Sequence, residues 1–244
     1  MLVGGRSLSR HVGPGDGYVT SVATAPSLVE RLARTVARAR RGRALHTRGT
    51  TYHATLRIAD HGQVYGVPLL DRPGTFRALA RLSRGAGLPP GWPDVMGLAV
   101  RIFDSDGAGA DADLLVSTVL GAVPLARQVP FPRRRHHGPY TSVAGYRTTG
   151  GRRYLAMWPE GDRRFVVAVA GRFSRFRFIG RIVLHARAPD DAALAFDPVR
   201  CRPAGLLADG VLQRLRVVAY RGSRAGRGGR LDWAEQPDNN SPAL

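Results

Sequence analysis

Apolar and polar residues alternate over short stretches between about residues 50 and 188, and this pattern predicts β-strands. Gly, Pro and Asp separate the stretches, and Val, Ile, Phe and Tyr are enriched within them. The expected strands are Thr50–Ile58, Phe76–Ser83, Gly97–Phe103, Asp113–Ser117, Tyr154–Trp158, Phe165–Ala170 and Ile179–His185. Seven or eight strands at this regular spacing indicate an antiparallel β-barrel.

A helical period replaces the alternation on both sides of the strands. After Pro26 and Ser27, apolar residues recur every three or four positions opposite a row of arginines, which predicts an amphipathic helix ending at Gly42. A second helix is expected to begin near Asp209, with Leu212, Leu215 and Val218 on one face. The expected fold class is therefore α+β: an antiparallel β-barrel of about eight strands with an N-terminal amphipathic helix and a C-terminal helix.

The composition of the 244 residues fits one globular domain. Hydrophobic residues make up 43% of the chain, which is enough for a single sizeable core. Both ends lack an apolar period and are rich in Gly, Arg or polar residues. We therefore expect a flexible segment over residues 1–25, a barrel domain over 26–227 and a disordered tail over 228–244.

All basic residues of the chain are arginines, and they outnumber the acidic residues by 37 to 18, a formal charge of +19. The absence of Lys together with abundant Ala, Gly and Pro is typical of a GC-rich genome, so we interpret most of this charge as solvated surface. It predicts weak, non-specific attraction to nucleic acid or anionic lipid. Phe173, Phe176 and Phe178 alternate with arginines, but only briefly for a base-stacking surface.

Several common classes of protein are excluded. Cys201 is the single cysteine, so a disulfide framework or a thiolate metal site cannot form within the chain. There is no dinucleotide fingerprint, phosphate-binding Gly-Lys pair or nucleophile elbow. Met1 to Gly17 lacks the pattern of a secretory signal and no apolar run approaches ~20 residues, so we expect a soluble, cytoplasmic protein. His136 and His137 follow three arginines without nearby carboxylates and are interpreted as a solvated loop.

Two segments carry candidate site residues. His46, at the start of the first strand, alternates with its neighbours so that it can face the barrel; a buried histidine bonded to a backbone carbonyl is the alternative. Arg81 and Ser83 share a face of the second strand with Leu79. A buried guanidinium requires an anionic partner, and carboxylates are scarce, so a ligand carboxylate is a reasonable partner. The alternative is an arginine at the barrel rim that reaches water.

The order of these segments resembles the catalase family. The sequence around His46, Arg-Ala-Leu-His-Thr-Arg-Gly, is similar to the family's distal histidine strand, and Arg81-Leu82-Ser83 to its Arg-Phe-Ser strand. Residues 97–103 and 113–116 resemble the family's Gly-Phe-Ala-Val-Lys-Phe and Asp-Leu-Val strands. Arg216 and Tyr220, four residues apart on the expected C-terminal helix, fall where the family has its haem ligand.

The resemblance implies a haem b site and a role for each matching residue. Tyr220 would bind the iron as a phenolate, which needs the metal and an adjacent positive charge such as Arg216. His46 would transfer a proton during the reaction, and Ser83 would orient its ring. Three arginines would hold the two propionates: Arg43, Arg81 and Arg227.

Departures from the family pattern narrow the expected activity. Ser117 and Thr118 stand where catalases have an Asn that helps to polarise peroxide, and Gly222 replaces an Asp that follows the ligand tyrosine. The chain is also much shorter than a typical catalase. We therefore expect a peroxidase or organic-hydroperoxide isomerase, acting on hydrogen peroxide or organic (lipid) hydroperoxides, rather than full catalase turnover.

Other functions remain open at this point. The barrel can hold haem or another apolar ligand without catalysis, because fold does not determine function. The arginine-rich surface can itself be the active feature and bind anionic partners. A phosphodiesterase-type hydrolase is the weakest alternative, since clustered His and Asp metal ligands are not visible. Self-association into a homo-oligomer is left open.

Overall fold

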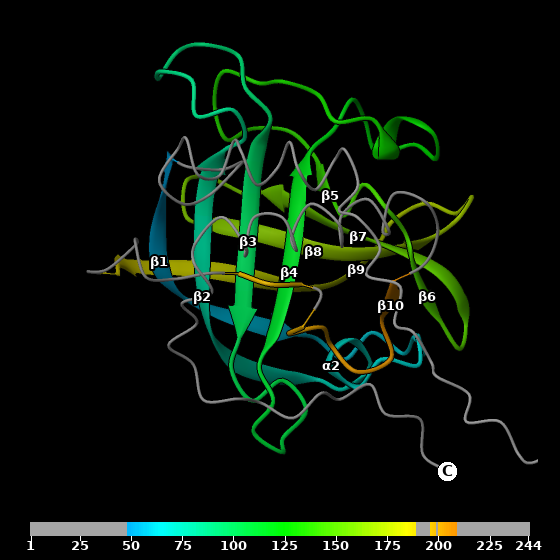
Figure 1. Cartoon of the computed structure of the whole chain (residues 1–244). Coiled ribbons are helices and arrows are strands. Elements are labelled where there is room, and N and C mark those ends of the chain that lie inside the picture. The colour runs from blue at the N-terminus through cyan, green and yellow to red at the C-terminus, as the bar shows by residue number, and fades with distance from the viewer. Residues whose placement is uncertain (1–47, 189–195, 199, 209–244) are drawn as a thin grey trace, which may run out of the picture.

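The computed structural model describes residues 48–188, 196–198 and 200–208 (Figure 1). Within these ranges most of the chain is β-strand. The elements are β1 (Arg48–Ile58), α2 (Pro68–Asp71), β2 (Gly74–Arg84), β3 (Met96–Ile102), β4 (Ala112–Thr118), the 3-10 helix η1 (Ala126–Gln128), β5 (Tyr140–Thr141), β6 (Tyr146–Thr148), β7 (Gly151–Pro159), β8 (Arg164–Gly171), β9 (Arg177–Arg187) and β10 (Leu207–Ala208). Every helix in the described ranges is too short or too polar to span a lipid bilayer.

Eight of the described strands close into an antiparallel barrel. The order around the ring is β1-β2-β3-β4-β5-β7-β8-β9, and the pairing of β9 with β1 completes it. β6 and β10 extend the sheet beside β7. The predicted barrel is therefore confirmed, and each of the seven expected strands is present.

The differences from the predicted elements concern short segments. β5, β6 and β10 contain only two or three residues, too few to produce a visible alternation. The two expected helices, ending at Gly42 and beginning near Asp209, lie outside the described residues, as do the segments 1–25 and 228–244.

The core occupies the inside of the barrel. Residues that face each other on β2, β3 and β4 form rows of apolar side chains, for example Ala80, Val100 and Leu114, each at most 1% exposed. Ala78 and Ala80 on β2 lie opposite the larger Ile102 and Val100 on β3, which lets the walls pack closely. Because side chains alternate along a strand, the residues between these positions face the barrel exterior.

One buried ion pair on the exterior attaches the segment after β9 to the barrel. Arg101 and Asp113 face each other on β3 and β4, and the guanidinium donates two hydrogen bonds of 2.8 and 2.7 Å to the carboxylate. Asp113 also accepts a 2.6 Å hydrogen bond from the Asp197 amide, and its own amide donates to the Cys201 carbonyl. Arg101 lies 5.5 Å from the centre of the Phe196 ring. Figure 1 shows this segment crossing in front of the sheet.

Burial and the contact between Arg101 and Asp113 shift the pKa values of the groups around this pair. Burial lowers the pKa of Arg101, but the hydrogen bond and charge of Asp113 raise it more, so the guanidinium remains charged. Burial raises the pKa of the Cys201 thiol to about 11, with a further contribution from Asp113, so this thiol is neutral. The positively charged Arg101 thus lies beside an uncharged cysteine.

Breaking this pair is expected to destabilise the fold. Asp113→Asn leaves a buried guanidinium without its carboxylate, which costs about 3–5 kcal/mol in the free energy of unfolding. Urea denaturation followed by circular dichroism measures the change. Arg181→Met is the matched control, because it breaks the surface pair Arg181–Glu160, whose side chains are 51% and 43% exposed; we expect a cost below about 1 kcal/mol. Equal effects of the two substitutions would contradict this assignment.

Candidate functional site

The predicted site residues divide into two groups. Arg81 and Ser83 lie on β2 within the described residues. The remaining five lie outside the described residues: Arg43, His46, Arg216, Tyr220 and Arg227. The structure therefore brings together Arg81 and Ser83, and their surroundings define the candidate site.

Arg81 and Ser83 lie on the exterior face of the barrel, in two neighbouring rows that cross four strands. The strand register places Arg81 beside Thr51 and Ala99, and Ser83 beside Gly49 and Gly97. On β4 these rows continue to Leu115 and Ser117. Leu115 is the largest apolar side chain in the two rows, and none of the eight residues is exposed. The result is a shallow face with small side chains around one guanidinium, which we call the Arg81 face.

Arg81 lies flat against β1 because residue 49 is glycine. A Cβ atom at Gly49 would lie 2.8 Å from Cζ of Arg81 and 2.5 Å from the Leu82 carbonyl oxygen, so a larger residue would displace the guanidinium or the strand. The whole Arg81 residue is only 3% exposed. An arginine at the rim reaching water, the alternative considered from the sequence, is therefore wrong.

Ser83 is also buried, at 4% exposure, and its hydroxyl donates a long hydrogen bond of 3.4 Å to the Gly97 carbonyl. Such a bond is weak. Ser117, two strands away, belongs to the same row. With Thr51, which lies beside Arg81, three hydroxyl groups thus accompany Arg81 on this face.

The strand register also decides between the two residues that stand where catalases have an Asn. Thr118 is fully buried, and its hydroxyl accepts a 3.0 Å hydrogen bond from the Met96 amide and donates a 2.8 Å bond to the Phe131 carbonyl. Both hydrogen bonds of the Thr118 hydroxyl are therefore made with backbone groups. Ser117 belongs to the Arg81 face, so its hydroxyl is the polar group that this position contributes to the face. The sequence pattern by itself leaves this choice open.

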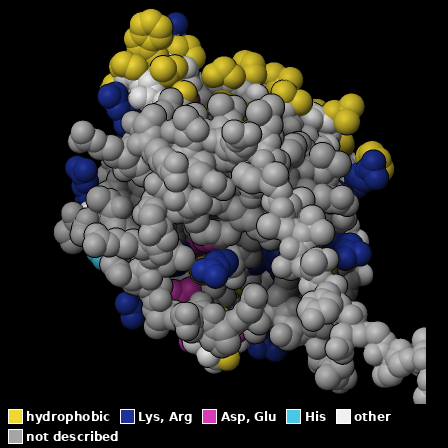
Figure 2. Space-filling model, in the orientation of Figure 1, with side chains coloured by type: hydrophobic (Ala, Val, Ile, Leu, Met, Phe, Trp, Pro, Cys, Tyr) yellow, Lys and Arg dark blue, Asp and Glu magenta, His cyan; other side chains and the backbone are white. Residues whose placement is uncertain are grey.

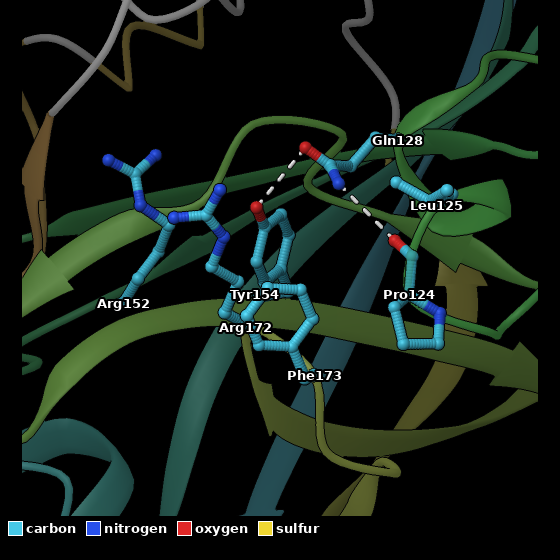
Figure 3. Close-up of a pocket in the computed structure, with 7 residues that line it drawn as sticks. All are labelled: Pro124, Leu125, Gln128, Arg152, Tyr154, Arg172 and Phe173. Carbon is cyan, nitrogen blue, oxygen red and sulfur yellow. Dashed lines mark hydrogen bonds between the residues drawn. The ribbon is translucent and has the colours of Figure 1, made fainter.

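A second candidate site is a pocket of about 240 Å³ beside η1. Figure 3 shows its lining residues: Pro124, Leu125, Gln128, Arg152, Tyr154, Arg172 and Phe173. The Tyr154 hydroxyl donates a 3.2 Å hydrogen bond to Oε1 of Gln128, whose amide donates to the Pro124 carbonyl. Two arginines next to apolar and aromatic surface suit an anionic amphiphile. Sequence reasoning missed this pocket, because its residues come from three distant segments.

A fully buried arginine holds this pocket together. Arg127 of η1 donates hydrogen bonds to the carbonyls of Gly171 and Ser174, at 3.2 and 2.7 Å, and its Cζ lies 4.6 Å from the centre of the Phe176 ring. Burial lowers the pKa of Arg127, and the nearby Tyr154 opposes this change. The contacts fasten the β4–β5 connection to the β8–β9 turn. Nothing in the sequence distinguishes Arg127 from the exposed arginines.

Of the two adjacent histidines, which were interpreted as part of a solvated loop, one is exposed and the other is not. His137 is exposed as expected, but His136 is largely buried, stacks against Tyr140 and shares a 2.9 Å hydrogen bond with its hydroxyl. Burial lowers the pKa of His136 to about 4, and the charge of Arg84 adds to this effect. His136 is therefore a neutral packing residue at neutral pH. No group of three or more His, Cys, Asp or Glu residues suited to a metal ion occurs within the described ranges.

The lowered pKa of His136 predicts acid sensitivity. The unfolded chain takes up a proton on this histidine near pH 6.5, whereas the folded chain does so only near pH 4, so stability falls as the pH drops through this window. The loss approaches about 3 kcal/mol at pH 4. His136→Asn, which preserves an acceptor for Tyr140 but does not titrate, should flatten this dependence. Urea midpoints measured from pH 7.5 to 4 test it, and an unchanged pH slope in the variant would refute it.

Comparison with solved structures relates the barrel to catalases. Catalase A from Saccharomyces cerevisiae is similar at 12% identity and a TM-score of 0.58, over 76% of this chain and 60% of that one. A fungal catalase matches at 11% identity and a TM-score of 0.58, over 76% and 58% of the two chains. A bacterial catalase matches at 13% identity and a TM-score of 0.55, over 98% and 73%. No protein-family model and no curated protein sequence matches the chain.

These likenesses define the class of fold. The chain has a distant catalase-like fold built on an antiparallel eight-stranded barrel, and it spans about 60% of the length of the first two catalases. At such identities the likeness establishes the fold alone. Activity, ligand and site residues have to be argued from the residues themselves.

Proposed function

We propose that this protein binds haem b on the Arg81 face and reacts with hydrogen peroxide or an organic hydroperoxide as a peroxidase. The observation that carries the proposal is the burial of the Arg81 guanidinium against Gly49, beside Ser83, on the exterior of a catalase-like barrel. Without the motif resemblance around His46 and Tyr220, the same face would suggest only an anionic, flat ligand. The resemblance is what adds haem.

The described residues fit a flat anionic group in three respects. The two rows of the Arg81 face carry little side-chain bulk, because Gly49, Gly97 and Ala99 have little or no side chain. Arg81 supplies a buried positive charge that suits a carboxylate such as a haem propionate. Ser83 and Ser117 supply hydroxyl groups on the same face.

The remaining roles follow from the resemblance and the chemistry of each side chain. Tyr220 would bind the iron, and Arg216 would keep the phenol ionised. Arg43 and Arg227 would share the propionates with Arg81. His46 would carry a proton from one peroxide oxygen to the other, work that suits a neutral imidazole, while Ser83 would accept its ring N–H. Haem, when bound, supplies the redox chemistry that these residues cannot perform.

The hydroxyl of Ser117 favours peroxidase activity over catalase turnover. An Asn amide at this position would offer two N–H donors to a peroxide, whereas a serine hydroxyl offers one donor on a shorter side chain. Ser117 is therefore expected to polarise the substrate less strongly. A larger organic hydroperoxide also gains space from the shorter residue, so both substrates remain within the proposal.

Replacing Arg81 is expected to weaken haem binding selectively. Arg81→Leu removes a charge-assisted hydrogen bond to a propionate, which lowers the affinity for hemin by about ten- to hundredfold. Absorbance titration of the apoprotein with hemin measures it. Arg77→Leu is the matched control, since Arg77 is on the same face of β2 but exposed, and its affinity should stay within about twofold of the native value. Equal losses in both variants would remove Arg81 from the site.

Two further variants separate haem binding from catalysis. Expressed with a haem precursor, the native protein should show a Soret band with ferric phenolate features that Tyr220→Phe loses. His46→Ala should retain that spectrum and lose most peroxidase activity, measured with hydrogen peroxide and an organic hydroperoxide, because a positioned proton carrier contributes about 10²–10⁴-fold. A colourless protein that also refuses added hemin would refute the proposal. A normal spectrum without turnover in the native protein would leave a non-catalytic haem-binding barrel.

A further inference from the structure

Two connections lie together at one end of the barrel. Residues 85–95 join β2 to β3, and residues 119–139 join β4 to β5. Asp94 and Arg133 form a β-bridge between them, with backbone hydrogen bonds of 3.0 and 2.8 Å. The two connections therefore form one continuous ledge rather than two independent loops.

Large hydrophobic side chains project from this ledge into solvent. Trp92 is 63% exposed, Val123 65% and Leu125 79%. Seven of the eleven exposed large hydrophobic residues in the described ranges belong to the ledge, and we call these seven the apolar rim: Leu88, Trp92, Leu120, Val123, Leu125, Val129 and Phe131. Figure 2 shows hydrophobic side chains gathered along the upper edge of the molecule, where Figure 1 places these connections. Such a concentration marks an interaction surface.

Backbone hydrogen bonds keep the rim in this exposed arrangement. The Leu120 amide donates to the Val129 carbonyl at 2.9 Å, and the Phe131 amide donates to Thr118 at 2.9 Å. The Trp92 carbonyl accepts from Arg84, whose side chain also reaches the Leu88 carbonyl. The rim is thus held by the barrel, and its side chains are presented outward by a fixed backbone.

The exposed charged side chains of the ledge are all positive. Its single carboxylate, Asp94, is only 4% exposed and accepts hydrogen bonds from the amides of Ala86 and Leu88. Arg134 and Arg135 are exposed on the same ledge. The pocket beside η1 shares Leu125 with the rim and adds Arg152 and Arg172. Apolar side chains are therefore bordered by arginines, and none of the described residues of the ledge is an exposed carboxylate.

We propose that the apolar rim docks the protein on an anionic lipid bilayer. Leu, Val and Phe side chains at the tips of connections would enter the interfacial region, Trp92 would lie at headgroup depth, and the bordering arginines would bind lipid phosphates. A nucleic acid would not use the aliphatic residues, which form most of the rim. This inference does not depend on haem or on the proposed activity.

Flotation of the full-length protein with lipid vesicles tests the proposal at physiological salt. The protein should bind vesicles of phosphatidylcholine mixed with phosphatidylglycerol, and Trp92 should give a blue-shifted emission that Trp92→Phe abolishes. The triple variant Trp92→Ser, Val123→Ser, Leu125→Ser should bind about tenfold or more weakly. The matched control carries Val64→Ser, Phe178→Ser and Leu207→Ser, three exposed hydrophobic residues outside the rim, and should bind as the native protein does.

A charge variant tests the arginine border separately. Arg172→Gln should weaken binding to the vesicles that contain phosphatidylglycerol by a few-fold, whereas Arg57→Gln, an exposed arginine paired with the opposite end of β2, should not. Binding that disappears at physiological salt, or that the rim variant leaves unchanged, would overturn the proposal. The proposal would also be overturned if the emission of Trp92 in the native protein did not shift on addition of vesicles. This measurement does not require the triple variant to fold. Capture of duplex DNA in preference to the vesicles would also count against it.

Discussion

Closure of the barrel by β9 and β1 determines which way the side chains of its strands point. In a closed antiparallel ladder the register of each pair depends on its neighbours, so a slip in one strand would have to be accommodated around the ring. A shift of one residue in β2 would exchange Ala80, which packs in the core, with Arg81. The core would then have to bury a guanidinium, and this cost holds the register in place.

The buried arginines of this protein are stabilised in different ways. Arg101 has the carboxylate of Asp113, whereas Arg127 has two backbone carbonyls and an aromatic ring. A chain with 37 arginines and 18 acidic residues cannot provide a carboxylate for each of them. Carbonyl oxygens and aromatic faces therefore replace carboxylates. Arg81 lies against Gly49 on a face of mostly small residues.

The Arg81 face and the apolar rim are neighbours in the structure. Ser83 lies two residues before the connection that carries Trp92, and Ser117 lies next to Thr118, which fastens Phe131 to the barrel. Both surfaces depend on the same strand ends. Their chemistry differs, because the Arg81 face has no exposed residue and consists mostly of small side chains, while the rim is exposed and contains large apolar ones.

The local sequence pattern was enough to predict the seven main strands. It also predicted that Ala80 and Arg81 lie on opposite faces of β2, because alternation along a strand is a property of neighbouring residues. It also pointed to Arg81 and Ser83, whereas the roles expected for His46 and Tyr220 stay predictions. Only the tertiary structure decided that Arg81 is buried, that Ser117 rather than Thr118 joins its face, and that His136 packs on Tyr140. It alone assembled the rim and the pocket beside η1, since these surfaces combine residues far apart in the chain, and their contacts arise from strand pairing that no local pattern encodes.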